Sequence, residues 1–340
     1  MLDGKKILVT GGTGSFGKQF IGTVLDRYEP DKLIVFSRDE LKQFQMQEAF
    51  PYEPGGPMRY FIGDIRDLRR LRFAMEGVDV VIHTAALKQV PAAEYNPFEA
   101  IKTNVLGAQN VIDAAIDAGV KKVIALSTDK ATAPTSLYGA TKLCSDKLFV
   151  SANNYSGMNN ITFSVVRYGN VLGSRGSVIP YFLKKAGTGV LPITDTRMTR
   201  FSITLEEGVD FVLKCLDAMW GGELFVPKIP SYKITDVATA VCSQCRIEII
   251  GIRPGEKLHE EMITTTDAIN TLEYNDYFVI MPAMSPKWSV PDFQQNSNPG
   301  KVGQFVSEGF SYDSSKNEQF LSIDEIHTLI KTLNTASVDP

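Results

Sequence analysis

Short apolar runs rich in valine and isoleucine alternate with longer helical patterns through the first half of the chain. The runs are Lys6–Thr10, Leu33–Phe36, Arg59–Ile62, Val78–Ile82, Val123–Leu126 and Phe163–Val166. Continuous apolar strands separated by helices are typical of a parallel sheet that is covered on both faces. The pattern therefore predicts an α/β fold built on a doubly wound parallel sheet.

The pattern changes after Asn170, where Gly, Ser and Pro interrupt the chain and clean strands become fewer. We expect residues 1–170 to form the sheet domain, residues 171–284 a smaller lobe, and residues 285–340 a tail that ends in a helix at Ile323–Leu333. Gly222–Val226 resembles one more strand that returns to the sheet. The two parts are therefore expected to interleave.

Composition and charge narrow the possible partners. The 340 residues are 44% hydrophobic and 22% charged, which is typical of a globular protein with a full core. A formal charge of −4 gives no broad positive field, so we expect no nucleic-acid partner. No apolar run approaches the roughly 18 residues of a membrane span, and no signal peptide is recognised, so a cytoplasmic protein without membrane contact is expected.

The chain has four cysteines, at Cys144, Cys215, Cys242 and Cys245. Four are too few for a disulfide framework in a chain of this length, so reduced thiols are expected. The pair at 242 and 245 has the spacing of a redox or metal site, but zinc would need two further ligands. We therefore expect ordinary packing there, and no metal.

A glycine-rich turn follows the first predicted strand, with Gly11, Gly14 and Gly17 at its three key positions. Missing β-carbons let the backbone approach a pyrophosphate, and the amino terminus of the next helix supplies N–H groups. A strand precedes the turn and a helix follows it, with a second strand about 20 residues on. This context favours dinucleotide binding in a Rossmann-type domain over a purely structural turn.

Ser37 and Arg38 stand at the end of the second strand, where an NAD site usually has an acidic residue. A guanidinium can bind a ribose 2′-phosphate, and Lys42 follows one helical turn later, so NADP is favoured over NAD. The alternative is a solvated arginine at a helix start, next to Asp39 and Glu40. Asp64 and Ile65 after the third strand, and Ala85 and Ala86 after the fourth, are further candidate cofactor contacts.

Tyr138 and Lys142 are four residues apart in a predicted helix that begins at Leu137, so they share one face. A lysine ammonium and an oxidised nicotinamide both favour the phenolate and are expected to lower the pKa of the tyrosine. Such a tyrosine takes the proton of a carbinol as hydride leaves, and Thr128 is placed to orient that hydroxyl. The alternative is a pair on the protein surface.

Asp129 and Lys130 follow Thr128 directly at the end of a strand. An acid and a base at this position can remove a proton next to a newly formed carbonyl group and protonate a hydroxyl group, which eliminates water. Lys130 as base and Asp129 as acid is one assignment, and the reverse is the other. A surface ion pair at a strand end is the alternative without function.

Together these motifs resemble the extended short-chain dehydrogenase/reductase superfamily. Within it, Thr-Gly-Gly-Thr-Gly-Ser-Phe-Gly, Ser-Arg-Asp-Glu-Leu-Lys-Gln, Ala-Ala-Leu-Lys, Ser-Thr-Asp-Lys, Arg-Tyr-Gly-Asn-Val, Met-Thr-Arg-Phe and Arg-Pro-Gly-Glu-Lys resemble the UDP-N-acetylglucosamine 4,6-dehydratases, of the C5-inverting type that opens pseudaminic acid synthesis. The resemblance implies NADP, a nucleotide-sugar substrate and a homo-oligomer, with hexamers in the family. It also implies that residues 1–170 bind the cofactor and residues 171–284 the substrate.

The candidate residues fall into three sets. The catalytic set is Thr128, Asp129, Lys130, Tyr138 and Lys142. With the motifs carried over, the cofactor set is Gly11, Thr13, Gly14, Ser15, Phe16, Gly17, Ser37, Arg38, Asp39, Glu40, Leu41, Lys42, Gln43, Asp64, Ile65, Ala85, Ala86 and Lys88, with Tyr138 and Lys142. The substrate set is Lys88, Asn170, Thr194, Arg200, Arg253 and Glu256, with Val178 and Met198 as apolar walls, and the resemblance implies Arg253 at the pyrophosphate and Glu256 at the ribose.

Two other functions fit parts of the same pattern. A nucleotide-sugar 4-epimerase that uses NAD(P) shares the first hydride step, but it has no hydroxyl to expel and no need of Asp129 and Lys130. A non-catalytic NADP sensor needs no proton shuttle, so Tyr138 and Lys142 argue against that function. The sequence therefore favours the dehydratase.

Overall fold

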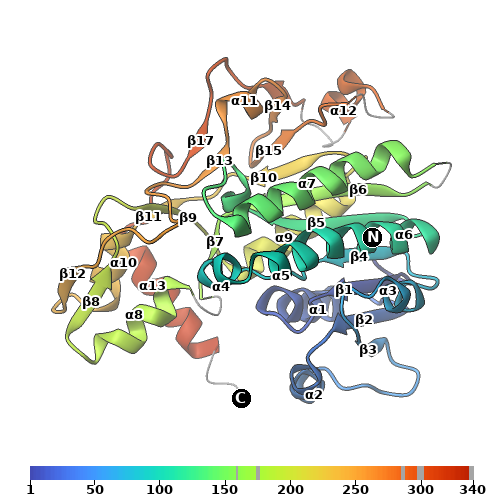
Figure 1. Ribbon diagram of the computed structural model, residues 1–340, viewed down its shortest axis with the longest axis horizontal. Coiled ribbons are helices and arrows are strands. Elements are labelled where there is room, and N and C mark those ends of the chain that lie inside the picture. The colour runs from blue at the N-terminus through green and yellow to red at the C-terminus, as the bar shows by residue number, and fades with distance from the viewer. Residues whose placement is uncertain (158–159, 174–176, 285–287, 297–301, 337–340) are drawn as a thin grey trace.

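The computed structural model describes residues 1–157, 160–173, 177–284, 288–296 and 302–336. Its centre is a ten-stranded sheet in the order β16-β14-β15-β10-β6-β5-β4-β1-β2-β3 (Figure 1). The strands of this sheet are β1 (Lys6–Thr10), β2 (Lys32–Ser37), β3 (Met58–Ile62), β4 (Val80–His83), β5 (Lys122–Thr128), β6 (Thr162–Tyr168), β10 (Leu224–Pro227), β14 (Thr271–Glu273), β15 (Tyr277–Ile280) and β16 (Gln304–Phe305).

The six apolar runs of the first half all form strands, and these pair in parallel from β3 to β6. The order of strands reverses between β1 and β4, which is the arrangement of a Rossmann-type sheet. The expected returning strand is confirmed, since β10 pairs in parallel with β6. The antiparallel strands β15, β14 and β16 then extend the sheet on that side.

Helices cover both faces of the sheet (Figure 1). On one face α3 (Leu68–Ala74), α6 (Gly107–Asp117) and α7 (Leu137–Tyr155) pack side by side, and on the other α1 (Ser15–Arg27) packs against α9 (Leu205–Ala218). The remaining helices near this sheet are α2 (Glu40–Ala49), α4 (Val90–Tyr95), α5 (Pro97–Ile101), a π-helical turn (Lys102–Leu106), a 3₁₀ turn (Asp129–Ala131), α11 (Thr265–Ala268) and α12 (Val290–Asn296).

A second, smaller core lies beside the main one. It contains α8 (Val178–Ala186), α10 (Ile234–Val241), α13 (Ile323–Ala336) and the parallel pair β8 (Val190–Ile193) and β12 (Arg246–Ile249). Its buried apolar side chains are Leu172, Ile179, Phe182, Leu191, Ile193, Met198, Tyr232, Ile234, Val237, Ala238, Ile326 and Ile330. The predicted terminal helix is thus confirmed, and it packs on α10.

Short strands join the two cores. The strands are β7 (Asn170–Val171), β9 (Thr199–Ile203), β11 (Ser231–Lys233), β13 (Glu261–Ile263) and β17 (Tyr312–Asp313). Strand β9 pairs with both β7 and β11, and β13 pairs with β17. The last part of the chain is divided, because β16 and β17 pack with the main core whereas α13 packs into the smaller one.

One expectation about the cysteines is wrong. Cys242 and Cys245 form a disulfide, with Cα atoms 5.4 Å apart, where reduced thiols were expected. Helix α10 ends at this point, and the turn that follows brings the amide of Cys245 to 3.2 Å from the carbonyl oxygen of Cys242. That turn places the two side chains within bonding range. Cys144 and Cys215 are free thiols, as expected.

In the described part of the chain, no helix has the length and apolar character needed to cross a membrane.

Candidate active site

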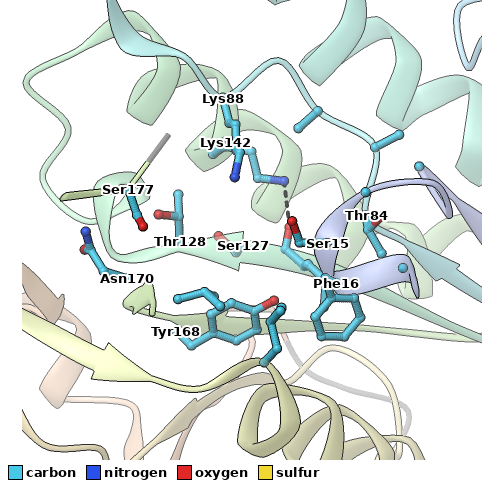
Figure 2. A pocket seen from close by; sticks show the side chains of 18 of the residues that line it. Ser15, Phe16, Thr84, Lys88, Ser127, Thr128, Lys142, Tyr168, Asn170 and Ser177 are labelled. Carbon is cyan, nitrogen blue, oxygen red and sulfur yellow. Dashed lines mark hydrogen bonds between the residues drawn. The ribbon is translucent and has the colours of Figure 1, made fainter. Parts of the chain in front are cut away.

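A cavity of about 480 Å³ opens at the carboxyl ends of β1, β4, β5 and β6. Figure 2 shows Lys88 and Lys142 on one side of it, Tyr168 and Phe16 on the opposite side, and Thr128, Asn170 and Ser177 at one end. Of the predicted residues, the cavity brings together Gly11, Thr13, Gly14, Ser15, Phe16, Gly17, Lys42, Ala85, Ala86, Lys88, Thr128, Lys130, Tyr138, Lys142 and Asn170.

The glycine turn presents a helix amino terminus to this cavity. Gly14 caps α1 without a side-chain hydrogen bond from the described residues, and no acidic side chain lies in the first turn of the helix. A β-carbon at Gly17 would lie 2.4 Å from the carbonyl oxygen of Gly12, so only glycine allows the helix to start this close to the strand. Unsatisfied N–H groups at such a terminus bind anions, so these residues fit the pyrophosphate of a dinucleotide.

The end of β2 divides its side chains between structure and solvent. Asp39 caps α2 by accepting from the amide of Lys42 at 3.0 Å, and it pairs with the ammonium of Lys42 at 2.9 Å. Gln43 is buried and donates to the carbonyl oxygens of Ser37 and Phe61. The side chain of Arg38 is 57% exposed, and among the described residues it makes a 3.8 Å ion pair with Asp64 and no further hydrogen bond or ion pair.

A second cavity adjoins the first and shares Ala86, Lys88 and Gln89 with it. Arg38 and Arg66 stand on its wall. The carboxylate of Asp64 accepts from the guanidinium of Arg66 at 2.6 Å. Ser37, Asp39, Glu40, Leu41, Gln43, Asp64 and Ile65 line neither of these two cavities. Some of the predicted cofactor residues therefore line the two adjoining cavities, and the others do not.

Tyr138 and Lys142 lie on one turn of α7, as predicted, and both line the first cavity. Burial raises the pKa of Tyr138 to about 12, and the hydroxyl of Thr128 and the nearby charge of Lys130 only partly oppose this. The ammonium of Lys142 donates to the carbonyl oxygen of Leu126 at 2.7 Å. Burial lowers the pKa of Lys142, although Asp146 opposes this. Among the protein's own groups, burial therefore outweighs the neighbouring charges, and the predicted lowering of the tyrosine pKa depends in addition on the charge of an oxidised nicotinamide.

Asp129 and Lys130 are in contact but differ in their access to the cavity. The ammonium of Lys130 donates to Oδ1 of Asp129 at 2.9 Å and lies 3.4 Å from Oδ1 of Asn170. The side chain of Lys130 is 28% exposed and lines the cavity, whereas that of Asp129 is 0% exposed and lies behind it. Although burial disfavours the charge, Asp129 and Glu260 together raise the pKa of Lys130 well above its usual value.

The predicted substrate residues are spread more widely. Lys88 and Asn170 line the cavity, and burial, with the charge of Lys130, lowers the pKa of Lys88. Arg200 donates to the carbonyl oxygens of Thr199, Lys257 and Leu258. The others, which do not line the cavity, are Val178, Thr194, Met198, Arg253 and Glu256; Thr194 contacts the sulfur of Met198, and Arg253 pairs with Glu256 at 3.8 Å.

Several cavity residues lie outside the three predicted candidate sets, although some of them stand at the ends of the predicted strands. They are Thr84, Gln89, Leu126, Ser127, Tyr168, Gly169, Val171, Ser177 and Leu205. Most directly end or follow a strand, so reading every residue at the strand ends as a candidate would have found them. Glu260, which contacts both Lys130 and Arg200, was also missed. No local pattern marks it, because its partners are distant in the chain.

The fold and the cavity define a class: a Rossmann-type protein of the short-chain dehydrogenase/reductase kind, with its Tyr and Lys on one helix beside a glycine turn. The chain belongs to the polysaccharide biosynthesis protein family, whose profile matches residues 7–282.

Known proteins resemble almost the whole chain. It is 57% identical over 332 residues to the inverting UDP-N-acetylglucosamine 4,6-dehydratase of Campylobacter jejuni subsp. jejuni serotype O:23/36 (strain 81-176), covering 97% of this chain and 98% of that one. It is 37% identical to the UDP-glucose 4-epimerase of Rickettsia canadensis (strain McKiel), covering 97% and 96%. The solved structure of Pen from Bacillus thuringiensis superposes with a TM-score of 0.88 at 37% identity, covering 98% and 99%.

Proposed function

We propose that this protein is an NADP-dependent UDP-N-acetylglucosamine 4,6-dehydratase. In this reaction C4 is oxidised, water is eliminated across C5 and C6, and hydride returns to C6, which gives a 4-keto-6-deoxy sugar nucleotide with C5 inverted. The observation that carries the proposal is that Lys130, paired with Asp129, lines the same cavity as Tyr138 and Lys142. The similarity to the Campylobacter dehydratase supports the substrate and the inversion.

The redox half of the cycle needs a base at the C4 hydroxyl. A nicotinamide dinucleotide held at the glycine turn of Gly11, Gly14 and Gly17 would supply the redox chemistry, as acceptor of the C4 hydride and donor of that hydride to C6. Tyr138 takes the hydroxyl proton, and the Thr128 hydroxyl, which hydrogen-bonds with Tyr138, orients it. Because the pKa of Tyr138 stands at about 12 without added charge, a positive charge beside it is needed to bring the phenolate into the working range.

The elimination half needs a group that exchanges protons at C5 and at the C6 oxygen. Oxidation of C4 makes the C5 proton acidic, since the carbanion is an enolate. Lys130 is the member of the pair that reaches the cavity, and Asp129 lies behind it at 2.9 Å, so a proton can pass between them. This pair removes the C5 proton and supplies the proton that leaves with the C6 hydroxyl as water.

Arg38 and Lys42 support NADP over NAD in this proposal. Asp39, the nearest carboxylate to the end of β2, is occupied as the cap of α2, so it is not free to accept from a ribose 2′-hydroxyl. We expect Arg38→Ala to weaken NADPH binding by about 10- to 100-fold, the range for a hydrogen bond to a charged group, and to leave NADH binding nearly unchanged. Fluorescence titration with both nucleotides measures this, and equal losses for both would contradict the assignment.

The wider setting belongs to the same proposal. We place the enzyme in the cytoplasm as a homo-oligomer, with the product entering pseudaminic acid synthesis. The predicted contacts of Arg253 with the substrate diphosphate and of Glu256 with the ribose are part of it.

The reaction is tested with UDP-N-acetylglucosamine deuterated at C4, in ordinary water and without added cofactor. A dehydratase that carries its own cofactor moves the deuterium to C6, releases one water and shows no net change in NADPH. Mass spectrometry and proton NMR of the product locate the label.

Two other outcomes separate the competing functions. The similarity to the Rickettsia epimerase makes a C4 epimer with its C6 hydroxyl intact a specific alternative, and that product would eliminate the dehydratase. Absence of turnover with retained NADP would indicate a sensor.

A further inference from the structure

Glu260 is a buried carboxylate that joins three distant segments of the chain. It lies directly before β13, and its Oε1 atom is 3.4 Å from the ammonium of Lys130 on the turn after β5. The same oxygen is 3.7 Å from Nε of Arg200 on β9. The Glu260 side chain is only 3% exposed, so the two cations face a carboxylate that water does not reach.

The backbone holds this carboxylate in place. The amide of Glu260 donates to the hydroxyl of Ser314 at 2.9 Å, and the amide of Ser314 donates to the carbonyl oxygen of Glu260 at 2.8 Å. The hydroxyl of Ser314 is also 2.8 Å from that of Thr199, the residue before Arg200. These hydrogen bonds fix the backbone of Glu260 relative to β9 and to the end of β17, and this in turn limits how far its carboxylate can move from Lys130.

Other charged groups surround Lys130 on every side. Asp129 on its own turn attracts the ammonium, and Arg200 on β9 and Lys88 after β4 repel it. Tyr138 on α7 and Tyr232 on β11 also face it. Lys257, near the limit of an ion pair with Glu260, adds a further positive charge. Without Glu260, Asp129 would be the single carboxylate among several cations, and the ammonium of Lys130 would be poorly compensated.

We infer that Glu260 is a positioning residue that keeps Lys130 charged and aimed at the cavity, and that ties it to Arg200. This inference rests on the proposed function in one respect, namely that Lys130 transfers protons in the cavity. In the resting protein, the negative charges of Glu260 and Asp129 balance the positive charges of Lys130 and Arg200. Lys130 therefore begins the reaction cycle protonated. The oxygen Oε2 of Glu260 and the oxygen Oδ2 of Asp129 have no hydrogen-bond partner among the described residues. Both carboxylates can therefore accept a further hydrogen bond from a neighbouring cation.

The charge of Lys130 is tested directly by competitive labelling of amines in the holoenzyme. A small amine-reactive anhydride is added briefly at pH values from about 7 to 11, and mass spectrometry follows the peptide that contains Lys130. The rate rises with the neutral amine and levels off above its pKa, so the pH of levelling reports the pKa independently of access.

In the wild-type protein, the labelling rate of Lys130 is expected to rise throughout that pH range. In Glu260→Gln it is expected to level off within that range, because losing a neighbouring opposite charge lowers the pKa of a lysine by about one to three units. Glu260→Asp, which keeps the charge but moves it, is expected to fall between the two, and it carries the test if Glu260→Gln does not fold. Glu261→Gln, the matched control next in the chain, is expected to match the wild type, because no contact of Glu261 includes Lys130.

A labelling rate that still rises throughout the range in Glu260→Gln, or that levels off equally early in Glu261→Gln, would overturn the inference. Turnover gives a second readout that a merely structural role would not move. In Glu260→Gln we expect a basic limb of kcat to appear at lower pH than in the wild type, in addition to any loss of rate. If the wild-type protein does not dehydrate the sugar nucleotide, the proposed function fails, while the labelling experiment still decides the role of Glu260.

Discussion

At the scale of single residues, burial decides which groups of the site can act. Asp129 and Glu260 have almost no exposed surface, whereas Lys130, whose ammonium pairs with both carboxylates, lines the cavity. Burial also raises the pKa of Tyr138, so its hydroxyl keeps its proton unless a further positive charge lies beside it. In the proposed reaction, the site would therefore take its reactive form only when its ligands are bound.

Lys130→Met tests which half-reaction needs the ammonium. We expect kcat for dehydration to fall by about 10²- to 10⁴-fold, the usual contribution of a general acid or base, while C4 oxidation persists. Addition of substrate to the variant should then raise the absorbance at 340 nm without forming a 6-deoxy product. Lys147→Met, an exposed lysine on α7, is the control and should behave as wild type. Full dehydration by Lys130→Met would remove Lys130 from the mechanism.

His83 gives a prediction about stability and pH. It is buried at the end of β4, its Nδ1 is 2.8 Å from the hydroxyl of Thr10, and burial lowers its pKa from 6.5 to about 3. The unfolded chain binds this proton near pH 6.5 and the folded one does not, so stability is complete above that pH. It is lost as the pH falls toward 3, by up to about 1.4 kcal/mol per pH unit.

Urea unfolding at pH 7 and pH 5 measures this loss. Because acidic side chains also titrate in this range, the comparison is between proteins: His83→Gln should lose about 1–2 kcal/mol less than the wild type between the two pH values. His327→Gln, an exposed histidine on α13, should lose as much as the wild type. Equal losses in all three proteins would show that His83 takes up its proton in the folded state.

At the scale of elements, the site depends on how closely α7 approaches the turn after β5. Ser136 caps α7 by accepting from the amide of Gly139, and the helix begins directly against Asp129–Ala131. A β-carbon at Gly139 would lie 2.1 Å from the carbonyl oxygen of Lys130. Glycine at this position therefore sets the spacing between the Tyr138 hydroxyl and the Asp129 and Lys130 pair.

Gly139→Ala should separate these two elements. We expect a stability loss of about 1–3 kcal/mol from overpacking and a larger fractional loss of kcat than of cofactor binding. Thermal unfolding, NADPH titration and turnover measure the three quantities. Gly187→Ala is the matched control, since its backbone φ is −60° and no atom lies within 4 Å of the added carbon. Wild-type activity in Gly139→Ala would show that the spacing is not critical.

At the scale of the whole molecule, the chain has two hydrophobic cores. The main core holds the glycine turn, whereas Met198 lies in the smaller core and contacts Thr194. The smaller core is closed by α13, whose Ile326 and Ile330 are buried against α10. Binding of the two predicted ligands should therefore depend on different cores.

Ile330→Ala separates these dependences. Loss of buried methyl groups should cost about 2–4 kcal/mol of stability, and we expect UDP to bind more weakly while NADPH binding stays unchanged. Calorimetric titration with each nucleotide and urea unfolding measure these effects. Ile323→Ala on the same helix is the control, because Ile323 is exposed and should cost little. A parallel loss of NADPH binding would indicate a single cooperative unit.

The sequence predicts the main sheet well because its signals are local. Each run from Lys6–Thr10 to Phe163–Val166 contains its own apolar, β-branched residues, and each forms a strand. Strands of two or three residues such as β7 and β11 carry no such pattern, so they were not predicted. Their structure depends on pairing with β9.

The same limit applies to the site. Tyr138, Lys142 and Lys130 were found because neighbours in the chain fix their geometry. The contact of Glu260 with Lys130 spans much of the chain, and the high pKa of Tyr138 follows from total burial. The disulfide at Cys242 depends on where α10 ends. None of these can be derived from spacing alone.

The smaller core has a consequence for biosynthesis, since its apolar side chains run from Leu172 to Ile330 along the chain. On a ribosome, Phe182 and Leu191 emerge long before the helix that covers them has been translated. The parallel strands from β1 to β6 can assemble early in synthesis, whereas the smaller core is complete only after α13 has been translated. A nascent chain stalled before residue 323 would thus expose an apolar surface to which chaperones can bind.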